Sequence, residues 1–197
     1  ESVKYTPVYE EDKKYWSDRA DNFSKAPELP LKTEPDKVGT PHFARKEAVI
    51  SQKDWEIIRN RAGKIGVTPS VVLIAAYSET LRKWSNNDKF VLNLTQFNRL
   101  PVHPQVDRLV GDFTTLTMLE IDSSGANCFA DRAKKIQKQL FNDLEHSFFS
   151  GVEMQRLLTR KANNVNVNMP IVFTSGLGID QWNEGSWIGK LVYNISQ

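Results

Sequence analysis

Apolar residues recur at helical spacing along two adjacent stretches in the first half of the chain. Ser51 and the aspartate three residues later resemble a capping box, which predicts a helix beginning at that point. The apolar positions of this helix are Trp55, Ile58, Ala62 and Ile65. Thr68 followed by Pro69 predicts a second helix, running to about residue 84. Residues 71–77 are almost wholly apolar, which is typical of a buried helix.

The second half of the chain alternates strand-like and helix-like patterns. We expect strands over 89–97, 113–121, 171–174 and 187–195, and in the first of them Phe90, Leu92 and Leu94 share one face. Asn127 is a candidate cap for a helix to about residue 144 whose inward positions would be Phe129, Ala133, Ile136 and Leu140. Ser150 with Glu153 forms another capping box, which predicts a helix to about residue 160.

The first fifty residues differ from the rest of the chain. One short helix is expected over about 10–22, with an apolar face made of Tyr15, Trp16, Ala20 and Phe23. Prolines make 26–44 an extended connection. We therefore divide the chain into a leading segment, 1–50, and a main unit, 51–197. The order of elements predicts an α/β (α+β) fold, a mixed sheet covered by helices, without the strict alternation of a doubly wound nucleotide-binding fold.

Composition then excludes several classes of protein. The 197 residues are 40% hydrophobic and 25% charged, a globular balance. Lys and Arg total 26 against 24 for Asp and Glu, too even for a nucleic-acid binder that works by bulk charge. Cys128 is the single cysteine, so an internal disulfide and a multi-cysteine zinc site are excluded. The sequence contains no run of 18 or more apolar residues, so it predicts no membrane span. Residues 1–9 do not resemble a signal peptide. Both observations fit a cytoplasmic protein.

The usual catalytic motifs are missing from the sequence. It contains no phosphate-binding loop, no dinucleotide fingerprint and no G-x-S-x-G nucleophile turn. His42, His103 and His146 are far apart, so we interpret each as a surface or hydrogen-bonding histidine rather than a metal ligand. We expect Cys128 to be a small buried residue at the start of a helix.

Polar residues do recur inside three strand-like runs. These runs are NLTQFNR (93–99), VGDFT (110–114) and PIVFTS (170–175). Asn93 and Thr95 point to the same side of a strand, and polar groups on a buried face need hydrogen-bonding partners or a wet cavity. Pattern alone leaves two interpretations open, namely the solvent-facing side of an edge strand or a cleft lined by strand residues.

Taken together, these motifs resemble the heterocyclization domains of nonribosomal peptide synthetases, within the condensation-domain superfamily. The resemblance is carried by segments 93–104, 110–114, 144–146, 150–153 and 169–175, and it extends to the helix that begins at 68–70. It implies a fold like that of chloramphenicol acetyltransferase, with two lobes and a tunnel between them, of which this chain resembles the C-terminal lobe. The family reaction joins an acyl or peptidyl carrier thioester to a Cys, Ser or Thr carrier thioester and cyclodehydrates the product to a thiazoline or oxazoline.

Site residues follow from the same resemblance. Thr174 matches the catalytic threonine of the family, while Asn93, Asp112 and Ser175 are candidates for the tunnel wall, with Asp112 bracing a turn or pairing with Arg99. The aspartate that partners this threonine in the family would follow the last strand and is not in this sequence, so we expect the 197 residues alone to be inactive. Trp182 and Trp187 are candidate loop anchors or partner contacts.

The resemblance also implies what the chain binds. No cofactor or metal is expected on the domain itself, because the substrates ride on the phosphopantetheine arms of upstream and downstream peptidyl carrier domains. The N-terminal lobe is a further expected partner, whereas nucleic acid and membranes are not. Two alternatives stay open. One is a coenzyme A-dependent acyltransferase of the same fold, although its H-H-x-x-x-D-G motif is absent. The other is a non-catalytic lobe that serves as a folding unit or a carrier-docking surface.

Overall fold

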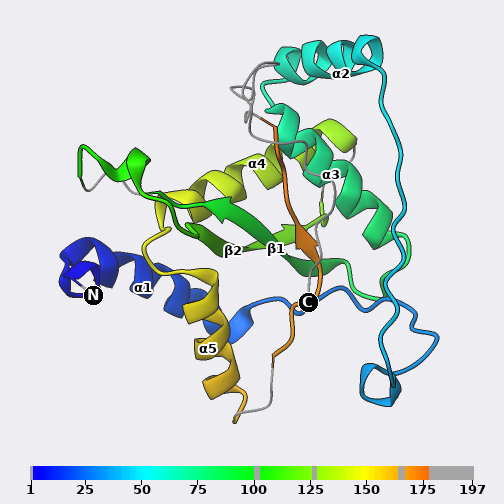
Figure 1. Cartoon of the computed structure of the whole chain (residues 1–197). Coiled ribbons are helices and arrows are strands. Elements are labelled where there is room, and N and C mark those ends of the chain that lie inside the picture. The colour runs from blue at the N-terminus through cyan, green and yellow to red at the C-terminus, as the bar shows by residue number, and fades with distance from the viewer. Residues whose placement is uncertain (1, 100–102, 126–127, 164–166, 178–197) are drawn as a thin grey trace.

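A computed structural model describes residues 2–99, 103–125, 128–163 and 167–177 of the chain (Figure 1). Its helices are α1 (Pro7–Arg19), α2 (Gln52–Lys64), α3 (Pro69–Arg82), α4 (Phe129–Glu145) and α5 (Gly151–Lys161). Its strands are β1 (Lys89–Phe97), β2 (Thr114–Asp122) and β3 (Val172–Phe173). Short 3-10 turns lie at Ser2–Tyr5, Ala20–Asn22, Pro35–Lys37 and Val106–Arg108. The mixed α/β class predicted from the sequence is confirmed.

The described strands form a sheet in the order β2-β1-β3. β1 and β2 pair antiparallel over their full lengths, from Lys89 opposite Asp122 to Phe97 opposite Thr114. β3 pairs parallel with β1, placing Val172 beside Asn93 and Phe173 beside Leu94. A parallel neighbour needs a long crossover, and here the crossover contains α4 and α5. The end of the sheet where β1 finishes therefore collects residues from all three strands.

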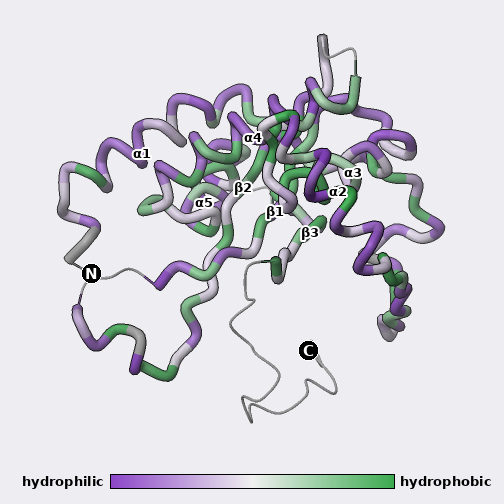
Figure 2. Tube along the Cα trace, turned by 90° about the horizontal axis from the view of Figure 1, so that it is seen from above, coloured by the Kyte–Doolittle hydropathy of each residue, from purple (hydrophilic) through white to green (hydrophobic). Residues whose placement is uncertain are grey.

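Helices cover both faces of this sheet, and each face has its own core. On one face, Phe90, Leu92 and Leu94 of β1 pack with α3 and α4. On the other face, Val91 and Met118 pack with buried residues of α1 and α5, among them Trp16 and Met154. Figure 2 shows the hydrophobic residues concentrated along the central strands, whereas the trace of α1 is mostly hydrophilic. The alternation of side chains along β1 thus supplies apolar groups to two layers of helices.

Local capping explains where the helices begin. Ser51, Thr68 and Ser150 each accept a hydrogen bond from a backbone N–H in the first turn of α2, α3 and α5, and Glu153 completes a capping box at α5. The predicted caps at these three starts are confirmed. α1 begins three residues earlier than predicted, because Thr6 caps it and Pro7 occupies its first position.

The start of α4 corrects two predictions. Cys128 occupies the cap position and is exposed instead of buried. Phe129 is 37% exposed and does not join the core, unlike Ala133, Ile136 and Leu140. Both residues precede the first turn that lies against the sheet, so helical periodicity alone did not reveal their exposure. The proposed cap Asn127 and the strand expected over 187–195 lie outside the described residues.

Gly151 shows how closely α5 approaches β2. A Cβ atom at this position would lie 2.6 Å from the carbonyl oxygen of Leu116. We expect Gly151→Ala to lower the free energy of unfolding by about 1–3 kcal/mol, because the backbone of β2 must shift to admit the methyl group. Gly63→Ala is the matched control, since nothing lies within 4 Å of its Cβ position. That change in α2 should stabilise the chain by about 0.5–1 kcal/mol, and urea unfolding of both variants measures the contrast. Equal effects of the two substitutions would contradict the close approach.

Candidate functional site

Thr174 lies directly after β3, at the end of the sheet where β1 finishes. Its side chain is exposed, and its hydroxyl donates a hydrogen bond to the hydroxyl oxygen of Thr95 at 2.9 Å. The parallel register explains the contact, since the pairs Asn93–Val172 and Leu94–Phe173 lead onward to Thr95 beside Thr174. Two hydroxyl groups from segments 79 residues apart are therefore held together at an accessible position.

Asn93 fastens β1 to the segment that carries Thr174. Its side-chain amide donates to the carbonyl oxygen of Met169 at 2.5 Å, and its backbone N–H donates to the carbonyl of Ile171 at 2.9 Å. The side chain is only 6% exposed, so the polar face of β1 is buried at Asn93. Its Oδ1 atom is buried and has no hydrogen-bond partner among the described residues, which leaves one acceptor directed into the protein.

Ser175 points away from the Thr174–Thr95 pair. Its hydroxyl lies 3.4 Å from that of Ser70, in the first turn of α3, and accepts a hydrogen bond from the backbone N–H of Leu177. A cavity of about 470 Å³ adjoins this position, lined by α2 residues, by Pro69 and Ser70, and by Leu177. Consecutive residues of an extended segment thus present one hydroxyl to β1 and the next to α3.

Asp112 stabilises the turn that leads into β2. Its carboxylate accepts a hydrogen bond from the backbone N–H of Thr114 at 2.8 Å, an Asx-turn. The hydrogen bonds from Thr114 hold the pKa of this exposed carboxyl below its usual value. Because Thr114 pairs with Phe97, Asp112 lies at the same end of the sheet as Thr174. No hydrogen bond or ion pair joins those two side chains among the described residues.

The predicted pairing of Asp112 with Arg99 is wrong. Arg99 donates instead to the carbonyl oxygens of Val106 and Leu109, at 2.6 and 3.0 Å, and its guanidinium lies 4.0 Å from the centre of the Phe113 ring. Arg99 therefore braces the loop between β1 and β2 through backbone acceptors. The suggested turn-bracing role of Asp112 is the one that fits its contacts.

Thr95 is a polar residue of the strand pattern that the family resemblance does not assign to the site. Its position two residues after Asn93 on the same face of β1 was the available signal. What the sequence did not reveal was which strand lies beside it. Ser70 was likewise noted only as part of a helix start, and its contact with Ser175 depends on the packing of α3 against the end of β3.

Other chemistry is sparse in the described part of the chain. No group of three or more His, Cys, Asp or Glu side chains there could hold a metal ion. No described helix is long and apolar enough to cross a membrane. His103 accepts a hydrogen bond from the backbone N–H of Gln105, and His146 pairs with the backbone carbonyl of Asn142 and stacks on Tyr15. Trp182 and Trp187 lie outside the described residues.

Comparison with known proteins places these features in a family. The family model described as "Condensation domain" matches residues 2–190. The chain is 39% identical over 175 residues to pyochelin synthetase PchF of Pseudomonas aeruginosa, covering 89% of this chain and 10% of that protein. It is 35% identical over 202 residues to phenyloxazoline synthase MbtB of a Mycobacterium species, covering 97% of this chain and 16% of that protein.

Solved structures agree with the sequence relatives. The cyclization-docking bidomain of the EpoB nonribosomal peptide synthetase from Sorangium cellulosum superposes with a TM-score of 0.79 at 35% identity, covering 90% of this chain and 36% of the bidomain. The first condensation domain of the calcium-dependent antibiotic synthetase is only 18% identical and, with a TM-score of 0.63, shares the fold. The chain thus spans about a third of the EpoB bidomain and a tenth of PchF.

Proposed function

Because this chain belongs to the condensation domain family, we propose that it is the C-terminal lobe of a heterocyclization domain in a nonribosomal peptide synthetase. The names of its relatives support the ring-forming branch of the family, since one is a phenyloxazoline synthase and another is a cyclization bidomain. In this proposal residues 51–197 form the lobe and residues 1–50 lead into it. α1 within that leading segment packs into the core beside α5.

The proposed reaction has two stages. The amine of a carrier-bound Cys, Ser or Thr first attacks an acyl or peptidyl thioester, which forms an amide and releases the donor carrier thiol. The side-chain thiol or hydroxyl then adds to the new amide carbonyl, which gives a tetrahedral carbon bearing a hydroxyl. That hydroxyl leaves as water after gaining a proton, while the ring nitrogen gives up its proton to a base. The product is a thiazoline or an oxazoline.

The Thr174–Thr95 pair carries this proposal, because it puts an oriented hydroxyl at an accessible end of the sheet. A threonine hydroxyl is a weak base, but it accepts and donates hydrogen bonds at once. Donating to Thr95 leaves the lone pairs of Thr174 available, and rotation about its Cβ–Oγ bond lets it donate to the departing hydroxyl instead. We propose that Thr174 positions the departing hydroxyl and relays a proton to it. A carboxylate outside this sequence is proposed as the main proton carrier.

Thr95 is proposed as a positioning residue for Thr174. Thr95→Val removes the acceptor while keeping the shape of the side chain, so we expect the ring-forming step to slow by about tenfold, as the loss of one hydrogen bond predicts. The KM for the carrier-bound substrates should not change, because Thr95 contacts Thr174 and not the carrier. Thr95→Ser restores the hydroxyl and should restore the rate. A raised KM with an unchanged rate would contradict the positioning role.

Partners and cofactors follow from the same proposal. Peptidyl carrier domains upstream and downstream deliver the substrates on phosphopantetheine, and the N-terminal lobe closes the tunnel. The domain itself needs no bound cofactor. The 197 residues assayed alone are expected to give no turnover, because the aspartate proposed to carry the protons is not among them.

The test is the intact mass of the carrier-bound product made by the complete domain that contains this chain. A product one water lighter than the linear amide supports heterocyclization. A linear amide as the final product would contradict it in favour of plain condensation. Transfer of an acyl group from coenzyme A to a free amine would instead support the acyltransferase alternative.

A further inference from the structure

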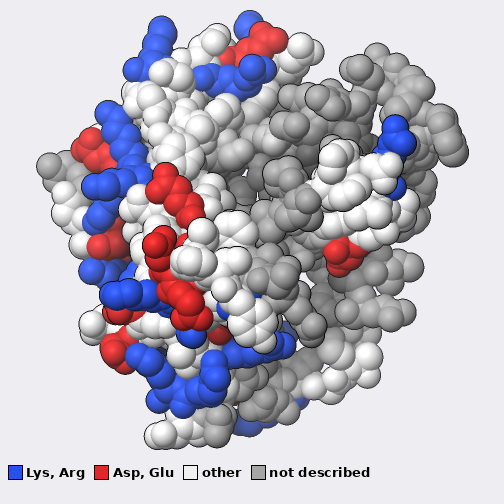
Figure 3. Space-filling model, turned by 90° about the vertical axis from the view of Figure 1, so that its left-hand side faces the viewer, with Lys and Arg blue, Asp and Glu red and all other residues white. Residues whose placement is uncertain are grey.

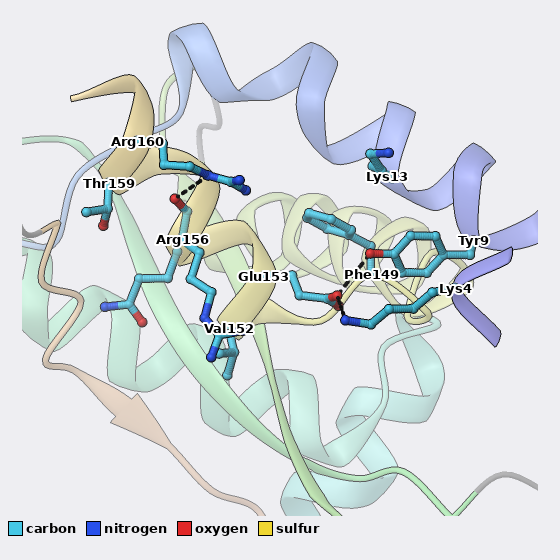
Figure 4. Close-up of a pocket in the computed structure, with 10 residues that line it drawn as sticks. Lys4, Tyr9, Lys13, Phe149, Val152, Glu153, Arg156, Thr159 and Arg160 are labelled. Carbon is cyan, nitrogen blue, oxygen red and sulfur yellow. Dashed lines mark hydrogen bonds and ion pairs between the residues drawn. The ribbon is translucent and has the colours of Figure 1, made fainter. Parts of the chain in front are cut away.

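A groove with an excess of positive charge lies between α1 and α5, away from Thr174. It encloses a cavity of about 700 Å³, the size of a small-molecule site. Four basic side chains line it, and Glu153 is the acidic residue among the lining side chains. The basic residues are Lys4, Lys13, Arg156 and Arg160. In Figure 4, Lys4, Tyr9 and Glu153 gather at one end of the groove and Arg160 lies at the other.

Internal contacts neutralise only part of this charge. The carboxylate of Glu153 is already bound by Lys4 at 3.0 Å and by the hydroxyl of Tyr9 at 2.9 Å. Lys13 pairs with the exposed Glu10 at 3.1 Å. Arg156 and Arg160 form no ion pair with any described residue, and the Nε of Arg160 reaches only the backbone carbonyl of Arg156. Two guanidinium groups, one helical turn apart on α5, are therefore available to an external anion.

Apolar groups form the wall beside these cations. Tyr9 and Phe149 pack against each other with ring centres 5.9 Å apart, and Val152 at the rim is 40% exposed. Burial and the hydrogen bond to Glu153 raise the pKa of Tyr9 to about 12, so this wall stays uncharged at neutral pH. The surface view from the side where α1 begins shows basic and acidic side chains next to one another over this face (Figure 3), so the excess of basic groups is specific to the lining of the groove.

We propose that this groove binds an organic anion, a phosphate or similar oxyanion group carried on an apolar stem. Guanidinium groups match the planar, bidentate geometry of oxyanions, which assigns the charged end of the ligand to Arg156 and Arg160. Val152 and the edges of the Tyr9 and Phe149 rings then contact the apolar stem. The site is separate from the Thr174–Thr95 pair, so its occupancy and the ring-forming reaction are independently testable.

The test uses 1-naphthyl phosphate as the probe and the 197-residue chain as the protein, followed by two-dimensional amide NMR at low ionic strength. We expect saturable shifts confined to residues 4–13 and 149–160, with inorganic phosphate and 1-naphthol each binding at least tenfold more weakly. Binding should weaken as salt is added, because the cations are exposed. No saturable binding, or shifts centred elsewhere, would overturn the proposal, as would inorganic phosphate binding as tightly as the probe.

Matched charge variants complete the design. Arg156→Gln with Arg160→Gln should weaken binding of 1-naphthyl phosphate at least tenfold. Arg61→Gln with Lys64→Gln removes the same charge from exposed positions at the end of α2 and should change the affinity less than twofold. Equal losses in the two double variants would show attraction to net charge alone and overturn the site. Unchanged amide spectra outside the groove establish that each variant is folded.

Discussion

Replacing Arg19 by methionine is expected to lower the free energy of unfolding by about 3–5 kcal/mol, because it leaves a buried carboxylate without its ion-pair partner. Arg19 donates to Asp143 at 2.5 Å and to Glu120 at 2.6 Å, and Asp143 is fully buried. Tyr15 and Gln139 also donate to the same oxygen of Asp143. These bonds join α1 to α4 and β2, so one guanidinium group links three elements of the fold.

The pH dependence of the Arg19→Met defect identifies its cause. Burial raises the pKa of Asp143 above its ordinary value, even though Arg19 opposes the shift. A raised pKa means that the contribution of Asp143 to stability is lost as the pH rises through the pKa of the folded state. Without Arg19 that pKa rises further. The defect should therefore be larger at about pH 7.5 than at about pH 4.5, nearer the ordinary carboxyl range. Urea unfolding at the two pH values measures it.

Two further variants isolate the buried charge. Lys14→Met breaks an exposed pair with Asp18 on the same helix and should cost less than about 1 kcal/mol. Adding Asp143→Asn to Arg19→Met removes the unpaired charge of the Asp143 carboxylate and should recover much of the stability. A defect that is independent of pH, or a double variant no more stable than Arg19→Met, would contradict this account.

Thr174→Val should slow ring formation by about 10²–10⁴-fold in the complete domain, the range for losing a positioned proton-handling group. Valine keeps the shape of the side chain and removes the hydroxyl that bonds Thr95. Amide formation should fall far less, because that step ends before water is lost. Linear amide on the acceptor carrier should therefore accumulate, and mass spectrometry of the carrier follows both species over time.

Conservative variants separate chemistry from folding at Thr174. Thr174→Ser keeps a hydroxyl and should retain ring formation within about tenfold of the wild type, since the donor and acceptor remain. Thr80→Val removes a hydroxyl whose one hydrogen bond among the described residues goes to the Ala76 carbonyl within α3, and it should leave both steps unchanged. If Thr174→Ser were as slow as Thr174→Val, the hydroxyl would not be the functional group.

Local signals made the helices and strands predictable. Capping residues fixed the starts of α2, α3 and α5, and alternation identified β1 and its apolar face. These patterns depend on neighbours a few residues away, which a sequence displays directly. Cys128 and Phe129 were misjudged because their exposure depends on where α4 first meets the sheet.

Contacts between distant segments account for the rest. The partner of Asn93 is the carbonyl of Met169, 76 residues away, and a backbone acceptor leaves no trace in the sequence. Arg99 was matched to Asp112 by charge, yet it satisfies its donors on carbonyl groups of its own loop. Thr95 became part of the site only through the parallel register of β1 and β3. Residue types suggested the candidates, and strand pairing decided which of them meet.

The most direct test of the central claim bypasses condensation altogether. A carrier domain is loaded with the preformed linear amide and mixed with the complete domain, in wild-type and Thr174→Val forms, and the appearance of the dehydrated product is timed in a single turnover. The account predicts rapid loss of water with the wild type and a slow, nearly complete block with the variant. Equal rates of water loss in the two would contradict the proposed role of Thr174.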